Sequence, residues 1–228
     1  MIHLVDTDTI GECWLNSIRM VMLNGVDFYD EDVKIKEIRG LVINVTNPQL
    51  DDKIINKYGD QKLIKHTLEK FSKGVVMHNR PFTYGDRIYN HYGVDQFEWL
   101  VNRLKQKIET KSATIGLLIA GDNSPNLPCL VTIDVKIRDN KLELQFFFRS
   151  QNIFGRQYAN LLALVKLQQD LSQECHVDIG HLKGYVASAH IYEYDFKDAN
   201  LLANYKDIQI QDKYYQCGPK SIRKDKNE

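Results

Sequence analysis

The 228-residue sequence has no long apolar run, no excess of charge of either sign and no closely spaced cysteines. No segment approaches the roughly 18 consecutive apolar residues that a membrane-spanning helix needs, so a membrane protein is not expected. The N-terminus, from Met1 to Asp6, lacks the basic start and the apolar stretch of a signal peptide, and we therefore expect a cytoplasmic protein. Thirty basic and thirty acidic residues cancel, so the chain as a whole offers no electrostatic footprint for nucleic acid or for an anionic membrane.

Cysteine is scarce, and no two cysteines form a CxxC pair. The four are Cys13, Cys129, Cys175 and Cys217. A disulfide framework and a zinc site are therefore not expected, and free thiols fit a reducing compartment. The 43% hydrophobic content is sufficient for one sizeable core, and no shift of composition divides the chain. We expect a single domain over residues 1–228, with a polar, disordered tail over about 211–228.

A pair of alternating apolar segments flanks Asp139-Asn140 and predicts two strands joined by a tight hairpin turn. Symmetric pairing about this turn would place Cys129 opposite Ser150, with Arg149 adjacent. A cation beside a cysteine stabilises the thiolate, which is the nucleophilic form, and a guanidinium with a hydroxyl suits a phosphate. A lone cysteine at the start of a strand is, alternatively, a small buried hydrophobe.

Apolar residues at helical or alternating spacing predict the other elements. Helices are expected over residues 10–24, 60–71 and 94–108, and a strand over residues 35–45. Asn24-Gly25 would end the first helix in a left-handed C-cap, and the acidic stretch 27–32 that follows is most simply a solvated loop. The apolar run from Leu161 to Leu171 predicts a central core helix.

Several motifs occur in the same order as the signature series of thymidylate synthases and the related pyrimidine hydroxymethylases. They are Arg39-Gly40-Leu41-Val42, Asn47-Pro48, Tyr84-Gly85-Asp86-Arg87, Pro128-Cys129, Arg149-Ser150, Asn160 and Ser188-Ala189-His190-Ile191-Tyr192-Glu193. The chain resembles the short archaeal-type members, from about residue 35 to residue 195. The resemblance implies an α+β fold of two or three layers, in which a mixed sheet has flanking helices that include the central apolar one. It also implies a homodimer with sites completed across the interface.

The resemblance assigns catalysis to three residues. Cys129 would add as thiolate to C6 of a uracil nucleotide, and Tyr84 would line the cavity beside it and order water for proton transfer. Asn160 would bind O4 and N3–H of the base, because its amide offers both a donor and an acceptor. If the resemblance is set aside, Tyr84 is an aromatic residue before a glycine turn. Such a residue more often packs in a core than takes part in catalysis. Asn160 is then equally suited to be the N-cap of a helix that begins at Leu161.

Besides Asn160, five residues would bind the substrate and the one-carbon donor. Arg149 and Ser150 suit the phosphate, and the resemblance assigns the ribose 3′-hydroxyl to His190 and Tyr192, which alternation places on one face of a strand. Asn152 stands where the family has an aspartate that binds the pterin ring of the folate, and its carbonyl oxygen can still accept a hydrogen bond. The donor would be methylene-tetrahydrofolate or a related pterin, and no metal is expected.

The cations that synthases use for the phosphate are largely absent. Lys111 and Ser112 stand where two adjacent arginines reach into the neighbouring subunit's site, and only Lys34 and Lys36 stand near the place of a further arginine. Residues 119–122 replace a segment that carries a tryptophan and an asparagine. Affinity for a dianionic monophosphate is therefore expected to fall, because each charge-assisted hydrogen bond is worth about 1.5–3 kcal/mol.

Three functions follow. The leading one is C5 methylation or hydroxymethylation of a uracil nucleotide, first of all dUMP, through a covalent Cys129 adduct at C6. The second is an enzyme of the same fold that acts on a nucleoside or another pyrimidine substrate. The third is a non-catalytic paralogue that binds a nucleotide or a protein partner.

Overall fold

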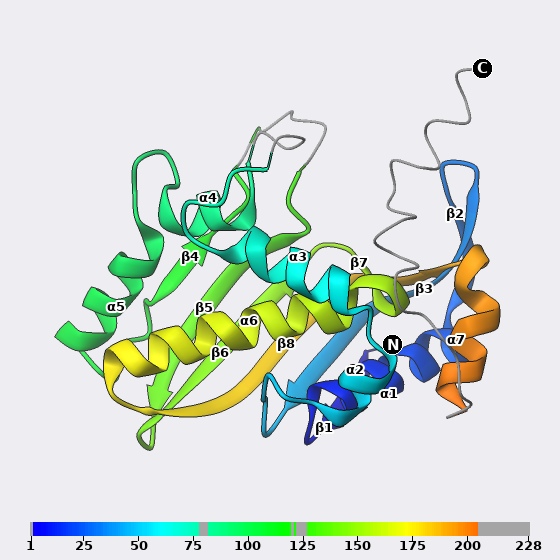
Figure 1. The fold of residues 1–228 in the computed structure, drawn as a ribbon, viewed down its shortest axis with the longest axis horizontal. Helices are drawn as coiled ribbons and strands as arrows, with labels where there is room; N and C mark the ends of the chain where they lie inside the picture. Colours follow the sequence, from blue (N-terminus) through cyan, green and yellow to red (C-terminus); the bar gives the residue numbers. More distant parts are fainter. Residues whose placement is uncertain (1, 78–81, 120, 122–126, 205–228) are drawn as a thin grey trace.

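The computed structural model describes residues 2–77, 82–119, 121 and 127–204, and in these ranges eight strands form one mixed β-sheet (Figure 1). The strands are β1 His3–Thr7, β2 Val26–Asp30, β3 Val33–Val45, β4 Thr114–Gly116, β5 Leu130–Arg138, β6 Lys141–Phe148, β7 Gln151–Asn152 and β8 Asp178–Tyr192. Their order is β1-β3-β8-β6-β5-β4, while β2 pairs with β3 and β7 pairs with β8. β1 with β3, β6 with β8 and β7 with β8 are parallel, and the other pairs are antiparallel.

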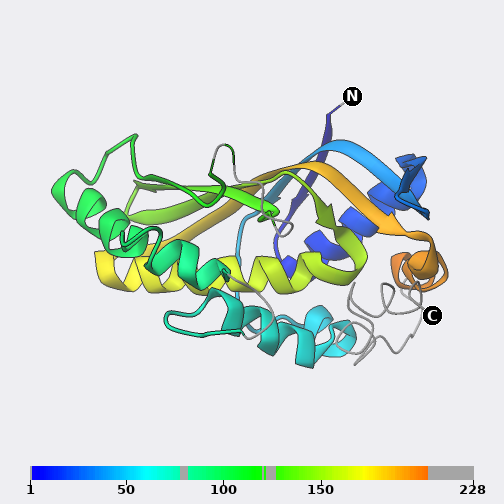
Figure 2. The same ribbon diagram turned by 90° about the horizontal axis from the view of Figure 1, so that it is seen from above.

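Helices cover one face of the sheet. In the described ranges they are α1 Ile10–Asn24, α2 Lys53–Tyr58, α3 Gln61–Phe71, α4 Tyr84–Tyr89, α5 Gln96–Gln106, α6 Ile153–Cys175 and α7 Phe196–Ala203. α6 packs against β6 and β8, and α3 packs on α6, so that sheet, α6 and α3 form three layers (Figure 2). The predicted α+β fold is confirmed. Within the described residues, no helix is long and apolar enough to span a membrane.

Part of the core lies where α1 packs against the start of α6. The Trp14 side chain is fully buried, and its indole N–H donates to the carbonyl oxygens of Ile153 at 3.0 Å and Phe154 at 3.1 Å. The rings of Trp14 and Tyr158 lie 4.4 Å apart between centroids. Because Ile153 and Phe154 form the first turn of α6, this packing fixes where that helix begins.

The acidic stretch 27–32 is not the predicted loop, because most of it forms β2. Its pairing with β3 brings Asp27 within 2.7 Å of the Lys34 ammonium and 3.1 Å of the Lys36 ammonium. The strands are joined by a turn in which Glu31 has a φ of 54°. The acidic residues are therefore tolerated in a strand since lysines on the neighbouring strand neutralise part of their charge.

Other boundaries also differ from the predictions. Gly25 ends α1 with a φ of −68°, so the predicted left-handed cap is wrong; its amide instead donates to the Val21 carbonyl. The strand predicted over 35–45 begins at Val33, and the helix predicted over 94–108 spans Gln96–Gln106 because the Asp95 side chain caps it. The polar tail over 211–228, Ala120 and Asp122 lie outside the described residues.

Candidate active site

The hairpin that carries Cys129 has a bulge near its open end. Asp139 and Asn140 both have positive φ, 49° and 57°, as the predicted tight turn requires. Pairing is symmetric as far as Thr132 and Phe147, but a register shift then pairs Leu130 with Phe148. Cys129 therefore faces Arg149, whose amide donates to the Cys129 carbonyl at 2.9 Å. The predicted pairing of Cys129 with Ser150 is wrong by one residue, because the bulge inserts one residue into β5.

The Arg149 guanidinium folds back over the segment that precedes the cysteine. Its Nε donates to the Pro128 carbonyl and its Nη2 to the Leu127 carbonyl, each at 3.0 Å. The positive charge is thus held within two residues of the Cys129 thiol. A guanidinium carries five N–H donors, so the same group can hold these carbonyls and still donate to an anionic ligand from its exposed side.

The described cysteines differ in their surroundings. Cys13 is fully buried, and burial raises the pKa of its thiol to about 12, so that it stays protonated and unreactive. Burial also raises the pKa of Cys175, near the C-terminus of α6. Cys129 is half-buried and stands beside a cation. Among the described residues, these surroundings favour Cys129 as the nucleophile, and no cluster of three or more potential metal ligands occurs there.

Tyr84 lies beside the cysteine strand. It begins α4, where Thr83 and Asp86 form a capping box. The Tyr84 hydroxyl oxygen accepts a hydrogen bond from the Leu130 amide at 3.2 Å, one residue after the cysteine. Its ring packs on Phe71 with centroids 4.6 Å apart. Tyr84 therefore packs as a core aromatic residue on Phe71. Its hydroxyl also lies at the residue that follows Cys129, where a catalytic role remains a prediction.

His190 and Tyr192 lie on the same face of β8, as alternation predicts. Their rings form an edge-to-face pair with centroids 5.2 Å apart. His190 is 8% exposed, and this burial lowers the pKa of the imidazole and keeps it neutral at neutral pH. The pKa of the Tyr192 hydroxyl is raised by burial and by its hydrogen bond to Asp30, with a smaller contribution from Cys129.

The chain between Arg149 and α6 connects these groups. The Arg149 carbonyl accepts a hydrogen bond from the Ser188 amide at 3.3 Å, and β7 then pairs Asn152 with His190. Ser150 is half-buried, and its hydroxyl forms no hydrogen bond with the described residues. Ser150 is thus placed between the guanidinium and the His190 strand, with its hydroxyl available.

Asn152, and not Asn160, is the N-cap of α6. Its Oδ1 accepts a hydrogen bond from the Gly155 amide at 2.8 Å. The alternative that Asn160 begins the helix is wrong, because α6 starts seven residues before it, at Ile153. Asn160 is half-buried, and its side-chain amide forms no hydrogen bond with the described residues. Both the donor and the acceptor of this side chain are therefore available. No hydrogen bond among the described residues joins Asn160 to Cys129, Arg149 or His190.

The order of these groups along the chain agrees with one known family. A family model described as thymidylate synthase matches residues 19–212, well over half of the chain. The chain belongs to the thymidylate synthase family.

Relatives from archaea extend this family match over most of the chain. The chain is 29% identical over 225 residues to a protein of Methanothermobacter marburgensis and 30% identical over 216 residues to one of Methanothermobacter thermautotrophicus, both named "Putative thymidylate synthase". Each alignment covers 87% of this chain and 97% of the relative. A protein of the same name from Methanosarcina mazei is 28% identical over 198 residues, covering 85% of this chain and 91% of the relative. The predicted resemblance to archaeal-type thymidylate synthases is confirmed.

The lysines nearest the place of one synthase arginine are already paired. Lys34 and Lys36 both bind the Asp27 carboxylate, which is only half-shielded from solvent. These contacts lower the pKa of Asp27, so the carboxylate is charged at neutral pH and offsets part of the lysine charge. The two lysines are therefore weak substitutes for a phosphate-binding arginine of the thymidylate synthases.

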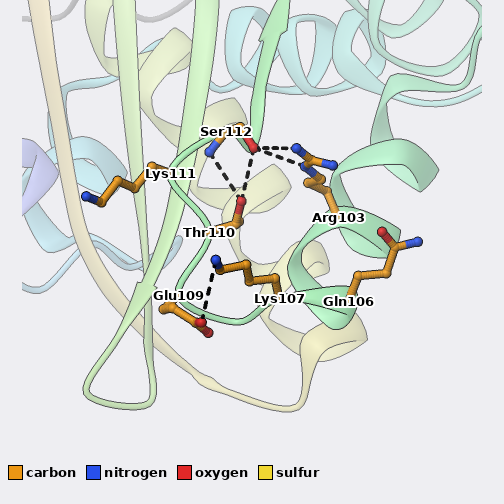
Figure 3. A pocket seen from close by; sticks show the side chains of 7 residues that line it. All are labelled: Arg103, Gln106, Lys107, Glu109, Thr110, Lys111 and Ser112. Carbon is orange, nitrogen blue, oxygen red and sulfur yellow. Dashed lines mark hydrogen bonds and ion pairs between the residues drawn. The ribbon is translucent and has the colours of Figure 1, made fainter.

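Arg103 is a cation that the sequence analysis did not find. It lies on α5, and its Nε and Nη2 donate to the Ser112 hydroxyl at 3.0 and 2.7 Å. Arg103 and Ser112 line a cavity of about 420 Å³, and Figure 3 shows Arg103 pointing toward Ser112 while Lys111, which also lines the cavity, extends away from Arg103. A guanidinium thus stands beside one of the positions where thymidylate synthases have paired arginines. Neither this cavity nor the one lined by β1, β2 and β3 residues includes any of the eight predicted site residues.

Proposed function

We propose that this protein transfers a one-carbon unit to C5 of a uracil nucleotide, as a methyl or a hydroxymethyl group, with dUMP as the leading substrate. Membership of the thymidylate synthase family supports one-carbon transfer to a pyrimidine. The observation that carries the proposal for this chain is the position of Cys129 at the open end of the hairpin, opposite Arg149, whose amide donates to the Cys129 carbonyl. A half-buried thiol beside a cation has the surroundings of a nucleophile.

In the proposed reaction the Cys129 thiolate forms a bond to C6 of the uracil ring. The electron pair of the C5–C6 double bond moves toward C5 and O4, and the Asn160 amide stabilises the resulting enolate by donating to O4. A water molecule held by the Tyr84 hydroxyl later takes the proton from C5. The sulfur–C6 bond then breaks, the double bond reforms and the thiolate is regenerated.

The neighbouring polar groups orient the nucleotide. We assign the phosphate to the Arg149 guanidinium and the Ser150 hydroxyl, which follow each other at the end of β6. We assign the sugar 3′-hydroxyl to His190 and Tyr192 on β8. The neutral imidazole suits a hydroxyl better than a phosphate, because it carries no charge to compensate a dianion.

The family generally uses a folate donor, which when bound would supply the one-carbon unit that C5 attacks, would leave as its amine, and would supply hydride for a methyl product, whereas water would complete a hydroxymethyl product. Asn152 fits the pterin ring of such a donor poorly. It has no carboxylate, and its carbonyl oxygen already accepts the hydrogen bond from the Gly155 amide. We therefore assign no step of the reaction to Asn152, whose role is to cap α6.

Label transfer from a methylene-labelled tetrahydrofolate tests the proposal. With dUMP, we expect label at C5 of the pyrimidine, and we expect dCMP to react at least about 10-fold more slowly, because N4 of cytosine donates where O4 of uracil accepts. Asn160→Asp should reverse this preference, since a carboxylate can accept from N4. Chromatography of the labelled nucleotides measures both rates.

The Asn160 variants also separate base recognition from folding. Asn160→Ala should lose transfer to both bases while its thermal unfolding midpoint stays within a few degrees of the parent. Absence of label in dUMP, UMP and dCMP alike, from a folded protein, would reject the enzyme and leave the non-catalytic alternative.

We further propose a homodimer formed by the open face of the sheet. In the described part of the chain, α1, α3, α6 and α7 lie on one side of the sheet, and no helix covers the other (Figure 2). On this open side Phe147 stacks on Tyr185, with centroids 5.7 Å apart, and Tyr185 is 40% exposed. Sheets packed back to back would bury these rings.

Sedimentation equilibrium tests the homodimer. We expect twice the 26.5 kDa chain mass at micromolar concentration, and Tyr185→Lys should shift the protein toward monomer because it buries a charge in the interface. A parent protein that sediments as a monomer contradicts the proposal.

A further inference from the structure

A side chain of the β2–β3 hairpin binds Tyr192 of the candidate sugar site. The Tyr192 hydroxyl donates to the Asp30 carboxylate at 2.7 Å, although the two residues are 162 positions apart. Asp30 is the last residue of β2, and Tyr192 is the last residue of β8. β3 lies between these strands and pairs Ile35 with Tyr192, so the Asp30 side chain reaches over β3 to the tyrosine.

Asp30 takes no part in the ion pairs that the described residues of this hairpin form. The lysines of the same hairpin, Lys34 and Lys36, bind Asp27, and no cation among the described residues forms an ion pair with Asp30. The only hydrogen bond that its carboxylate forms with the described residues is the one from Tyr192. Asp30 is therefore a strong acceptor dedicated to the tyrosine hydroxyl.

This bond decides what Tyr192 can offer to a ligand. A phenol has one proton to donate and lone pairs that accept. Because the proton points to Asp30, the oxygen faces any other partner as an acceptor, and donation into the carboxylate makes that oxygen a better acceptor. A sugar hydroxyl can donate to it, whereas a phosphate dianion, which only accepts, cannot.

His190 completes a pair suited to a hydroxyl. Its ring lies edge to face with Tyr192, and it is more than nine-tenths buried. Its Nδ1 has no hydrogen-bond partner among the described residues, which is unusual for a buried polar atom. The charged groups that act on the imidazole are Asp30 and Glu37, and Glu37 is itself bonded by the Ser188 hydroxyl. Both carboxylates disfavour an anion here.

We propose that Asp30 is a positioning residue that fixes Tyr192 as the acceptor for a sugar hydroxyl and so selects pyrimidine nucleotides whose sugar carries a 3′-hydroxyl. The inference rests on the proposed function, because it takes the ligand to be a pyrimidine nucleotide. It adds a specificity determinant on the β2–β3 hairpin.

Titration calorimetry with dUMP and its 2′,3′-dideoxy analogue tests the assignment. The parent protein should bind dUMP about 10-fold more tightly than the analogue, a ratio typical of one hydrogen bond. Asp30→Ala should reduce this ratio to about one to three by weakening the binding of dUMP alone. Asp30→Asn should retain the ratio within about twofold, because the amide oxygen still accepts from Tyr192.

Two further variants separate positioning from a general effect on the hairpin. Asp27→Asn removes both ion pairs of the hairpin without touching Tyr192, and it should leave the ratio unchanged. Tyr192→Phe should lower the ratio as Asp30→Ala does, and the double variant should show no further loss, because both changes act on the same contact between Tyr192 and the sugar hydroxyl. In turnover, Asp30→Ala should raise KM for dUMP with little change in kcat.

The outcomes distinguish the two levels of the proposal. A folded parent protein that binds neither nucleotide rejects the proposed function. Binding of dUMP with an Asp30→Ala ratio equal to that of the parent rejects the role of Asp30 and leaves the proposed function standing. Additive losses in the double variant also reject the role of Asp30, since they would mean that Asp30 and Tyr192 act independently.

Discussion

Cys129→Ser is expected to lower one-carbon transfer to dUMP by at least about 10³-fold, because a serine hydroxyl in this position has no base to ionise it. A cation such as Arg149 can stabilise the anion of a thiol, whose ordinary pKa is about 8.5, but it cannot bring a hydroxyl with a far higher pKa into its anionic form. Nucleotide binding should change little, since the phosphate, sugar and base contacts are assigned to other side chains. Label transfer measures the rate, and calorimetry with dUMP measures the affinity.

Cys175→Ser is the matched control for this substitution. Its thiol is half-buried near the far end of α6, and burial raises its pKa, so it has no nucleophilic role in the proposed reaction. We expect its transfer rate to stay within about twofold of the parent, consistent with a substitution away from the site. A Cys129→Ser protein that keeps its rate, or a Cys175→Ser protein that loses it, would assign the chemistry to another group.

The sequence predicted the hairpin but not the partner of the nucleophile. Alternation and Asp139-Asn140 define the two strands and their turn by local geometry alone. The bulge is instead stabilised from outside the hairpin, because the amides of Leu117 and Leu118 donate to the Val131 carbonyl at 2.8 and 3.4 Å. A contact from outside the hairpin leaves no local signal in either of its two strands. The pairing of Cys129 with Arg149 could therefore not be predicted.

The two asparagines near α6 show a similar limit. Both suit an N-cap by residue type, and the apolar run after Asn160 favoured a later helix start than the true one. The choice is made by packing: Trp14 holds the carbonyls of Ile153 and Phe154, which commits these residues to the helix and leaves Asn152 at its end. The central helix itself was predictable, because its apolar residues lie between the sheet and α3 and leave a continuous hydrophobic run.

Charged residues were the least predictable part of the site. The acidic stretch 27–32 has a loop-like composition, yet Asp27 pairs with two lysines and Asp30 with a tyrosine from the far end of the chain. Arg103 reaches Ser112 only because α5 lies against the segment that leads into β4. The order of motifs identifies residues that occupy the same positions as in a family. A cation that comes from another element, such as Arg103, can be found only in the folded structure.

Trp14→Ala is expected to lower the free energy of unfolding by about 3–5 kcal/mol, the usual cost of truncating a large aromatic side chain in a core. The indole is fully buried between α1 and α6, and its loss leaves a cavity against Tyr158. Its N–H also bridges the carbonyls of Ile153 and Phe154. Because a domain of this kind is stable by only about 5–15 kcal/mol, the variant should unfold at a much lower urea concentration. Circular dichroism during urea unfolding measures the change.

Trp14→Phe divides this loss into its two parts. The phenyl ring fills most of the cavity but cannot donate to either carbonyl, so its cost should be nearer about 1–2 kcal/mol. Trp99→Phe is the control, since Trp99 is 41% exposed on α5 and should change stability by no more than about 0.5 kcal/mol. Equal losses for Trp14→Phe and Trp14→Ala would assign the stabilisation to the hydrogen bonds instead of to packing. Because those bonds hold the first turn of α6, Trp14→Phe should then also weaken dUMP binding, as Asn160 lies on the same helix.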